Sequence, residues 1–246
     1  MRQALRLVLL TLVASSCASP DTAGPAAGAP SISVEEAMRT FRAEQDRLYR
    51  GGCEEGADLA HRRRWIERFR ELTRGGDPVQ VNLAYGAWAL LLTNLQNAGY
   101  EEGVGRESLP LFREWAERYP TSRVLGDSLW MLADTAPDDR IAETLGFLEA
   151  LDASPTDAVA RGALAAHADL LEYLERADEA TPLLEQIVRR WPGSFEARLA
   201  RRDLRALALV AGVEAPAFAL RNLQGDEVSL ASLRGRVTLL YFFSFG

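Results

Sequence analysis

Two cysteines and two histidines are the side chains of this sequence best suited to act as nucleophiles, proton carriers or zinc ligands: Cys17, Cys53, His61 and His167. A His/Cys zinc site uses ligands that lie in close sequence pairs. With only two histidines and two cysteines, all far apart except Cys53 and His61, the chain lacks the ligands for such a site. We therefore expect no metal and no cofactor. The two histidines are isolated in sequence, which favours core or groove positions over catalytic ones.

Cys53 lies in the glycine-rich segment GGCEEG. It would be the only thiol left if Cys17 were modified. We interpret it as a free thiol, with pairing to a cysteine outside this chain as the alternative. No residue of the sequence is assigned a catalytic role.

Charge composition argues against a nucleic-acid-binding protein. The 246 residues include 28 basic and 35 acidic side chains, giving a net charge of −7, and every basic residue is an arginine. A nucleic-acid-binding domain needs a positive surface instead. Arg62, Arg63 and Arg64 beside Trp65 are therefore interpreted as a solvated helix face rather than a nucleic-acid patch.

A second group of arginines falls at helical spacing near the end of the helical region. Its members share one helix face and are Arg198, Arg201, Arg202 and Arg205. The sequence again favours solvation, since Glu196 and Asp203 are close by. Docking onto the segment that follows is the alternative.

The N-terminus has the layout of a secretory signal peptide. Arg2 and Arg6 precede an apolar run at residues 7–13, and small residues then lead to Cys17. This arrangement resembles the lipobox of bacterial lipoproteins, although Ala14 replaces the more common leucine; an ordinary signal peptide with an incidental cysteine is the alternative. The resemblance implies lipidation of Cys17, export, and a periplasm-facing outer-membrane location. Residues 18–32 are expected to form a flexible tether, and no apolar run reaches the ~20 residues of a membrane span.

Residues 33–210 are expected to form a helical domain. Ser33 with Glu36 makes a capping box, and Asp77-Pro78 combines an N-cap with a first-turn proline. The predicted helices cover about 33–49, 57–74, 78–98, 106–119, 121–134, 138–152, 156–175, 178–191 and 194–210.

The later helices repeat with a nearly constant period. Pro120, Pro155 and Pro192 each close one helix just before the next begins. Small residues follow each proline at the same offset, and large apolar residues precede it: Ser128, Ala163 and Ala200, and Phe112, Phe147 and Leu184. A helix pair of ~34 residues with these features resembles the tetratricopeptide repeat over residues 78–210. The resemblance implies a stacked solenoid that binds a protein or peptide, with irregular helix stacking as the alternative.

After residue 210 the helical period stops. Residues 212–220 begin a strand pattern, Gln224-Gly225-Asp226 forms a turn, and a short strand follows at 227–230. A helical turn is predicted at 231–233, ending at Gly235. Residues 237–245 are a continuous β-branched and aromatic run, typical of a strand buried on both faces.

These residues resemble the opening of the thioredoxin-like redoxins, which include membrane-anchored thiol–disulfide oxidoreductases and peroxiredoxins. The pattern G-x-x-A-P-x-F-x-L, then L-x-G-x-x-x-S-L-x-x-L-x-G-x-V, is matched from Gly212 to Val237. The fold class expected is thus mainly α, with tetratricopeptide-like helical hairpin repeats, followed over residues 212–246 by the β-rich beginning of an incomplete thioredoxin-like α/β domain. In the oxidoreductase branch a Cys-x-x-Cys follows the buried strand at once, at a helix N-terminus that favours the thiolate.

On this pattern Gly246 precedes the first active-site cysteine, so we expect the 246-residue chain to have no thiol–disulfide activity itself. Three explanations for the position of the last residue remain open: a sequence fragment, a nonsense stop and a misread selenocysteine codon. Two function classes follow. The one we favour, because the redoxin match is the more specific, is a lipid-anchored, extracytoplasmic thiol–disulfide oxidoreductase of the redoxin family rather than a peroxiredoxin. The alternative is a helical-repeat lipoprotein that scaffolds envelope proteins. The partners expected are the membrane and a protein or peptide, with no nucleic acid.

Overall fold

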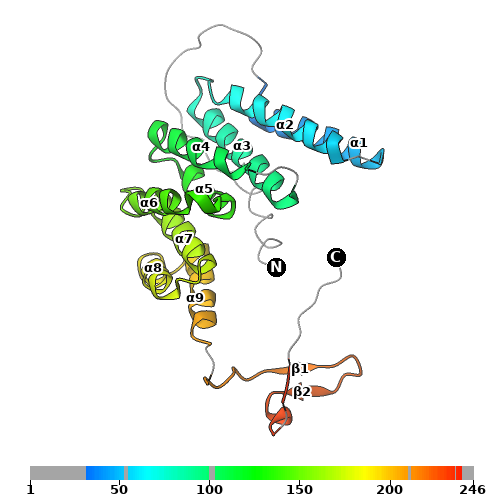
Figure 1. The fold of residues 1–246 in the computed structure, drawn as a ribbon, viewed down its shortest axis with the longest axis vertical. Coiled ribbons are helices and arrows are strands. Elements are labelled where there is room, and N and C mark those ends of the chain that lie inside the picture. Colours follow the sequence, from blue (N-terminus) through cyan, green and yellow to red (C-terminus); the bar gives the residue numbers. More distant parts are fainter. Residues whose placement is uncertain (1–31, 53–54, 100–102, 210–211, 236, 240–246) are drawn as a thin grey trace. The chain divides into compact units, whose positions relative to one another are not determined.

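The computed structural model describes residues 32–52, 55–99, 103–209, 212–235 and 237–239. Within them lie nine α-helices and one two-stranded antiparallel sheet, which confirms the expectation of a mainly α protein (Figure 1). None of the described helices is both long and apolar enough to cross a bilayer. Contacts divide the chain into two compact units, Met1–Glu102 and Gly103–Gly246.

The first unit contains α1 (Val34–Arg50), α2 (Glu55–Leu72) and α3 (Pro78–Ala98). Ser33 and Asp77 are N-caps, as predicted: the Ser33 hydroxyl accepts a hydrogen bond from the Glu36 amide, which is one half of the predicted capping box, and the Asp77 carboxylate accepts one from the Val79 amide. α3 ends at Gly99, whose φ of 68° lies in the left-handed region that glycine adopts without strain. Turn and cap residues therefore fix the helix limits here.

Aromatic side chains fill the core of this unit. α2 packs against α3 and α1 through Phe41, Trp65 and Phe69, with Tyr85 and Trp88 contributed by α3. The rings of Trp65 and Phe69 lie 5.7 Å apart, and those of Tyr85 and Trp88 6.4 Å apart. Such rings bury a large apolar area each, so three helices suffice for a core.

The second unit begins with three helical pairs in succession: α4 (Gly105–Arg118) with α5 (Arg123–Thr135), α6 (Ile141–Asp152) with α7 (Asp157–Tyr173), and α8 (Ala177–Arg190) with α9 (Phe195–Leu207). A 3-10 turn, η4 (Asp138–Arg140), precedes α6. α7 packs against α5, α6 and α8, and α8 packs against α9. The small residues of the predicted repeat, Ser128, Ala163 and Ala200, are all buried.

Two glycines allow α5 and α7 to touch along their backbones. A Cβ on Gly162 would collide with the backbone of Gly126, and a Cβ on Gly126 would collide with the backbone of Ala158. Both glycines lie inside helices, where glycine is otherwise unfavourable by about 1 kcal/mol relative to alanine. Close packing of the two helices is therefore the physical reason for these glycines.

Prolines occupy equivalent positions inside the first helices of two pairs. Pro110 is the sixth residue of α4 and Pro182 the sixth of α8. Proline has no amide hydrogen, so the carbonyl oxygen four residues earlier loses its helical donor. In α4 that carbonyl belongs to Arg106 and in α8 to Asp178.

The C-terminal part of the second unit is a β-hairpin. β1 (Ala219–Arg221) pairs antiparallel with β2 (Glu227–Ser229), with Leu220 opposite Val228. The side chain of Asn222 accepts hydrogen bonds from the amides of Gln224 and Asp226, which closes the turn. The predicted helical turn is present as η5 (Ala231–Leu233). The predicted strand at 237–245 is not seen at 237–239, which have no regular structure, and the rest lies outside the described residues.

Candidate functional site

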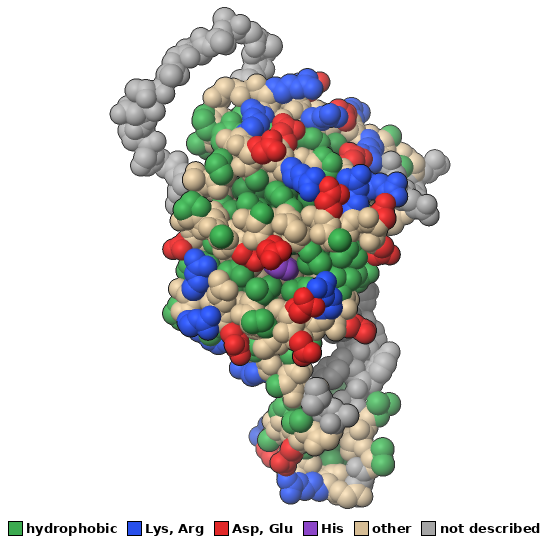
Figure 2. Space-filling view, turned by 60° about the vertical axis from the view of Figure 1, so that its left-hand side comes forward, with side chains coloured by type: hydrophobic (Ala, Val, Ile, Leu, Met, Phe, Trp, Pro, Cys, Tyr) green, Lys and Arg blue, Asp and Glu red, His purple; other side chains and the backbone are tan. Residues whose placement is uncertain are grey.

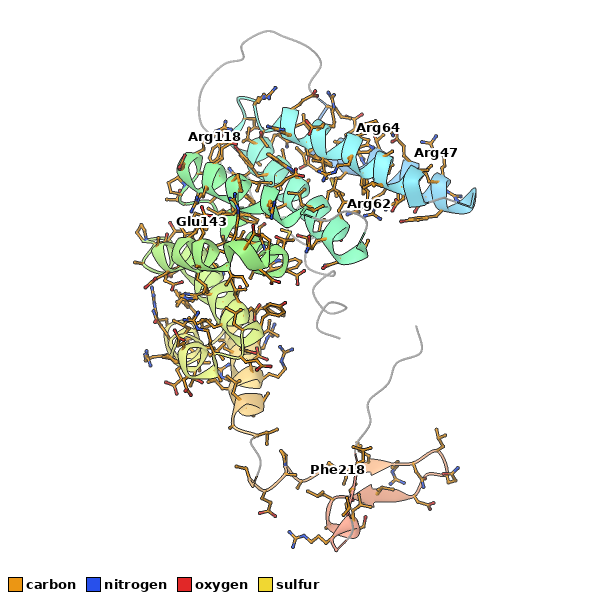
Figure 3. The ribbon with its side chains drawn as sticks, in the orientation of Figure 1. Arg47, Arg62, Arg64, Arg118, Glu143 and Phe218 are labelled. Atoms are coloured by element: carbon orange, nitrogen blue, oxygen red, sulfur yellow. The ribbon has the colours of Figure 1, made fainter. Side chains whose placement is uncertain are left out.

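A groove of about 600 Å³ lies between α1 and α2, where it is lined by Glu44, Arg47, Leu48, Ala57, Ala60, His61 and Arg64. α1 contributes Arg47 and α2 contributes Arg64, both labelled in Figure 3. It is an open concave site, and it brings together three kinds of titratable side chain: glutamate, arginine and histidine. For these reasons it is the candidate binding site of the first unit.

Glu44 joins the two helices at this groove. Its Oε2 accepts a hydrogen bond from Trp65 Nε1 at 2.9 Å and one from the Arg64 guanidinium at 2.9 Å. The indole donor, aided by Arg64, lowers the pKa of Glu44 against the opposing effect of burial. Glu44 is thus held as a carboxylate that pins α1 to α2.

His61 lies beneath Glu44 and is nearly inaccessible, as expected for a core or groove histidine. Its ring stacks on Phe41 with centroids 5.1 Å apart, and its Nδ1 lies 3.6 Å from Glu44 Oε2. Burial lowers the pKa of His61, and the positive charge of Arg64 lowers it further; Glu44, the Phe41 backbone and Asp58 oppose this. His61 is therefore a neutral imidazole near pH 7.

We expect His61 to make the protein less stable in mild acid. Its pKa is lower in the folded chain than in the unfolded chain, where it is about 6.5. As the pH falls from about 6.5 towards the folded pKa, the unfolded chain binds the extra proton, so the free energy of unfolding decreases by at most about 1.4 kcal/mol per pH unit. Urea unfolding of the full chain and of His61→Gln between about pH 7.5 and about pH 5 measures this. Equal slopes for both proteins would contradict it.

The prediction that Arg62, Arg63 and Arg64 form a solvated helix face is wrong for Arg62, which is buried. Its Nε donates to Asp58 Oδ2 at 2.8 Å, and its guanidinium also donates to the Tyr49 hydroxyl at 3.0 Å. Asp58 is itself 1% exposed. The solvated-face prediction holds for Arg64, which is exposed. Successive residues of a helix point in different directions, so the three arginines cannot share one environment.

His167 pairs with a carboxylate in the second unit. Its Nδ1 lies 3.0 Å from Asp152 Oδ2, joining α7 to the end of α6. Burial raises the pKa of Asp152, while His167 lowers it and Glu149 raises it. A histidine beside a carboxylate is a combination that acid–base catalysis also uses, but the sequence predicts no nucleophile for this pair. Its contribution to the fold is to hold the α6–α7 pair together.

The arginine face of α9 is only partly neutralised. Arg202 pairs with the neighbouring Asp203 at 2.8 Å, whereas Glu196 pairs with Arg161 of α7 at 2.9 Å. Arg198 lies over the ring of Phe195, and Arg201 donates to the carbonyl of Pro192. Of the two acidic residues close by in sequence, Asp203 does pair with an arginine of this face, whereas Glu196 pairs with an arginine of another helix.

Charged side chains of both signs alternate with hydrophobic ones over the helical surface in Figure 2. Among the residues that the structure describes, no three His, Cys, Asp or Glu side chains converge on a possible metal position. Cys17, the predicted lipidation site, and Cys53 both lie outside the described residues. Comparison with protein-family models, curated proteins and solved structures finds no significant match to the chain.

Proposed function

We propose that this chain is an exported, membrane-anchored helical-repeat protein that binds a polypeptide partner. The observation that carries the proposal is the succession of helical pairs in the second unit, in which Ser128, Ala163 and Ala200 are buried at the same place in successive pairs. Repeated pairs that bury one face against their neighbours leave an extended outer surface, which suits a polypeptide better than a small molecule. Several of the charged contacts, such as Glu44 with Trp65 and Asp152 with His167, join neighbouring helices, which also favours binding over catalysis.

Anchoring is part of the same proposal. Acylation of Cys17 would attach the chain to a membrane, and residues 18–32 would separate the helices from the lipid. Mass spectrometry of the N-terminal peptide of the mature protein tests this directly. An acylated cysteine at position 17 is the expected result, and an unmodified Cys17 inside a longer peptide would contradict it.

Photo-crosslinking in the producing cell tests the binding function. A photoreactive amino acid is placed at Ala142 or Ala150 of α6, or at Glu185 of α8, all exposed, and at exposed Arg39 of α1 as a control. We expect adducts of polypeptide mass from the first three positions and none from Arg39. Absence of adducts from all positions of the second unit would overturn the proposal.

A second candidate function is supported by the C-terminal hairpin. β1, the Asn222 turn, β2 and η5 follow one another in the order that the resemblance to thioredoxin-like redoxins requires. The exposed Leu220 of β1 is also typical of a strand that is covered in a complete α/β domain. We therefore propose kinship with the membrane-anchored thiol–disulfide oxidoreductases, in which case the helical pairs would bind the redox partner.

Reading the coding DNA beyond the codon for Gly246 tests this kinship. The resemblance predicts a cysteine or selenocysteine codon next in frame, followed after two codons by a cysteine. An in-frame continuation of that kind supports an oxidoreductase, and selenium detected by mass spectrometry would identify selenocysteine. A stop codon with no related frame beyond it would leave only the binding function.

A further inference from the structure

Five arginines at the end of the helical stack make no ion pair with a described side chain. They lie on the last turn of α8 and on α9: Arg189, Arg190, Arg198, Arg201 and Arg205. Four of them are exposed, and Arg201 is half-buried. In a chain of net charge −7 this is a local excess of positive charge. We call these five residues the α8–α9 arginine surface.

Most arginines elsewhere in the second unit do have acidic partners. Arg106 pairs with Asp139 at 2.9 Å and Arg113 with Glu143 at 2.6 Å, while Arg161 pairs with Glu196. Ion pairing is thus the usual arrangement of arginine in this unit. Within the described helical pairs, the arginines that lack an acidic partner are confined to one end of the stack.

Several side chains of the surface are already held in place. Arg190 lies 4.3 Å above the Trp191 ring, Arg198 lies 5.5 Å from the Phe195 ring, and Arg201 donates to the carbonyl of Pro192 at 2.9 Å. On α9 the spacing of three, four and seven residues also keeps Arg198, Arg201 and Arg205 on one face. Guanidinium groups held in this way lose less conformational entropy when they bind an anion.

We propose that the α8–α9 arginine surface binds an acidic segment of a partner polypeptide. The inference deepens the proposed binding function and rests on it. Planar guanidinium groups match carboxylates with two parallel hydrogen bonds, and a row of them along a helix fits carboxylates that recur along a chain.

The packing of α9 favours a polypeptide over an anionic membrane. Leu204 and Leu207 pack inward against a cluster that includes Leu184, Ile187 and Ala200. The apolar side of α9 is thus used within the stack and cannot enter lipid beside the arginines. Helices that lie on membranes combine basic residues with an apolar face buried in the bilayer.

Fluorescence anisotropy with a labelled glutamate-rich peptide, at least as long as the 13 residues of α9, tests the proposal on the full chain. The test variant is Arg189→Gln/Arg198→Gln/Arg205→Gln. Its matched control, Arg106→Gln/Arg113→Gln/Arg118→Gln, removes the same charge from α4, where the arginines are exposed and paired. We expect the full chain and the control to bind alike and the test variant to bind about tenfold more weakly, with each lost pair contributing a factor of ~2. Circular dichroism establishes that both variants fold.

Three results would overturn the proposal. They are no binding of the peptide by the full chain, equal loss in both variants, and a preference for phosphatidylglycerol over phosphatidylcholine vesicles that the test variant loses. A lipid anchor would bind the chain to both vesicle types, so the difference in binding between them reports on the arginines alone. Crosslinked polypeptide adducts on α6 or α8 without peptide binding would remove this inference and leave the binding function standing.

Discussion

Replacing Gly162 by alanine is expected to lower the free energy of unfolding of the second unit by about 2 kcal/mol. The new methyl group would meet the backbone of Gly126, and backbone atoms cannot turn aside as a flexible side chain can. Overpacking of this kind costs about 1 to 3 kcal/mol or more, whereas alanine regains about 1 kcal/mol of helix propensity. Because α5 and α7 must separate to admit the methyl group, we place the steric cost at the upper end.

Gly146→Ala is the matched control for this substitution. Gly146 also lies inside a helix, α6, but a Cβ there meets no atom within 4 Å. The control is expected to raise the free energy of unfolding by about 0.5 to 1 kcal/mol. Urea unfolding followed by circular dichroism measures both variants. Equal stabilisation by the two alanines would show that α5 and α7 are not in backbone contact.

The sequence predicted the helices well because their ends are set by local chemistry. Ser33, Asp77-Pro78 and Gly99 act on neighbouring amides and carbonyls, and their effects do not depend on the rest of the chain. The contact between Gly126 and Gly162 is different. The proline period aligned small residues near it, but only packing in three dimensions reveals which two backbones meet.

Replacing Asp58 by alanine is expected to destabilise the first unit by about 3 kcal/mol. Asp58 is buried and accepts a hydrogen bond from Arg62 Nε, so its removal leaves a buried guanidinium without its carboxylate. Breaking one side of a buried ion pair costs about 3 to 5 kcal/mol, and the hydrogen bond from Arg62 to Tyr49, which the substitution leaves in place, puts the expected loss at the lower end.

Replacing both partners of the ion pair separates the effect of its charges from simple loss of packing. In Asp58→Leu/Arg62→Met both charges are replaced by apolar groups, and such replacements are often neutral or stabilising. We therefore expect the double variant to be more stable than Asp58→Ala. If the double variant loses as much stability as Asp58→Ala, packing rather than charge accounts for the effect. Unfolding in urea, followed by the fluorescence of the five tryptophans, of which Trp65 and Trp88 lie in the first unit, compares the two variants.

The candidate site could be predicted only in part from the sequence. Asp58 and Arg62 are four residues apart on one helix, and this spacing is a local signal from which an ion pair can be predicted. Glu44 reaches Trp65, and Asp152 reaches His167, across separate helices. Nothing in the spacing of those residues distinguishes them from the many other charged side chains, so helix packing was needed to find them.

Pro110 and Pro182 also bear on how the helical stack moves. Each proline leaves one carbonyl without its helical donor, at the same place in α4 and in α8. The turn before each proline is therefore joined to its helix by fewer hydrogen bonds than the turns after it. We therefore expect these turns to open locally while the core stays intact, and their amides to exchange with deuterium sooner than those of α5 and α7, which hydrogen–deuterium exchange measures. In this stack the contact between α5 and α7 is expected to stay closed while the first turns of α4 and α8 open and close.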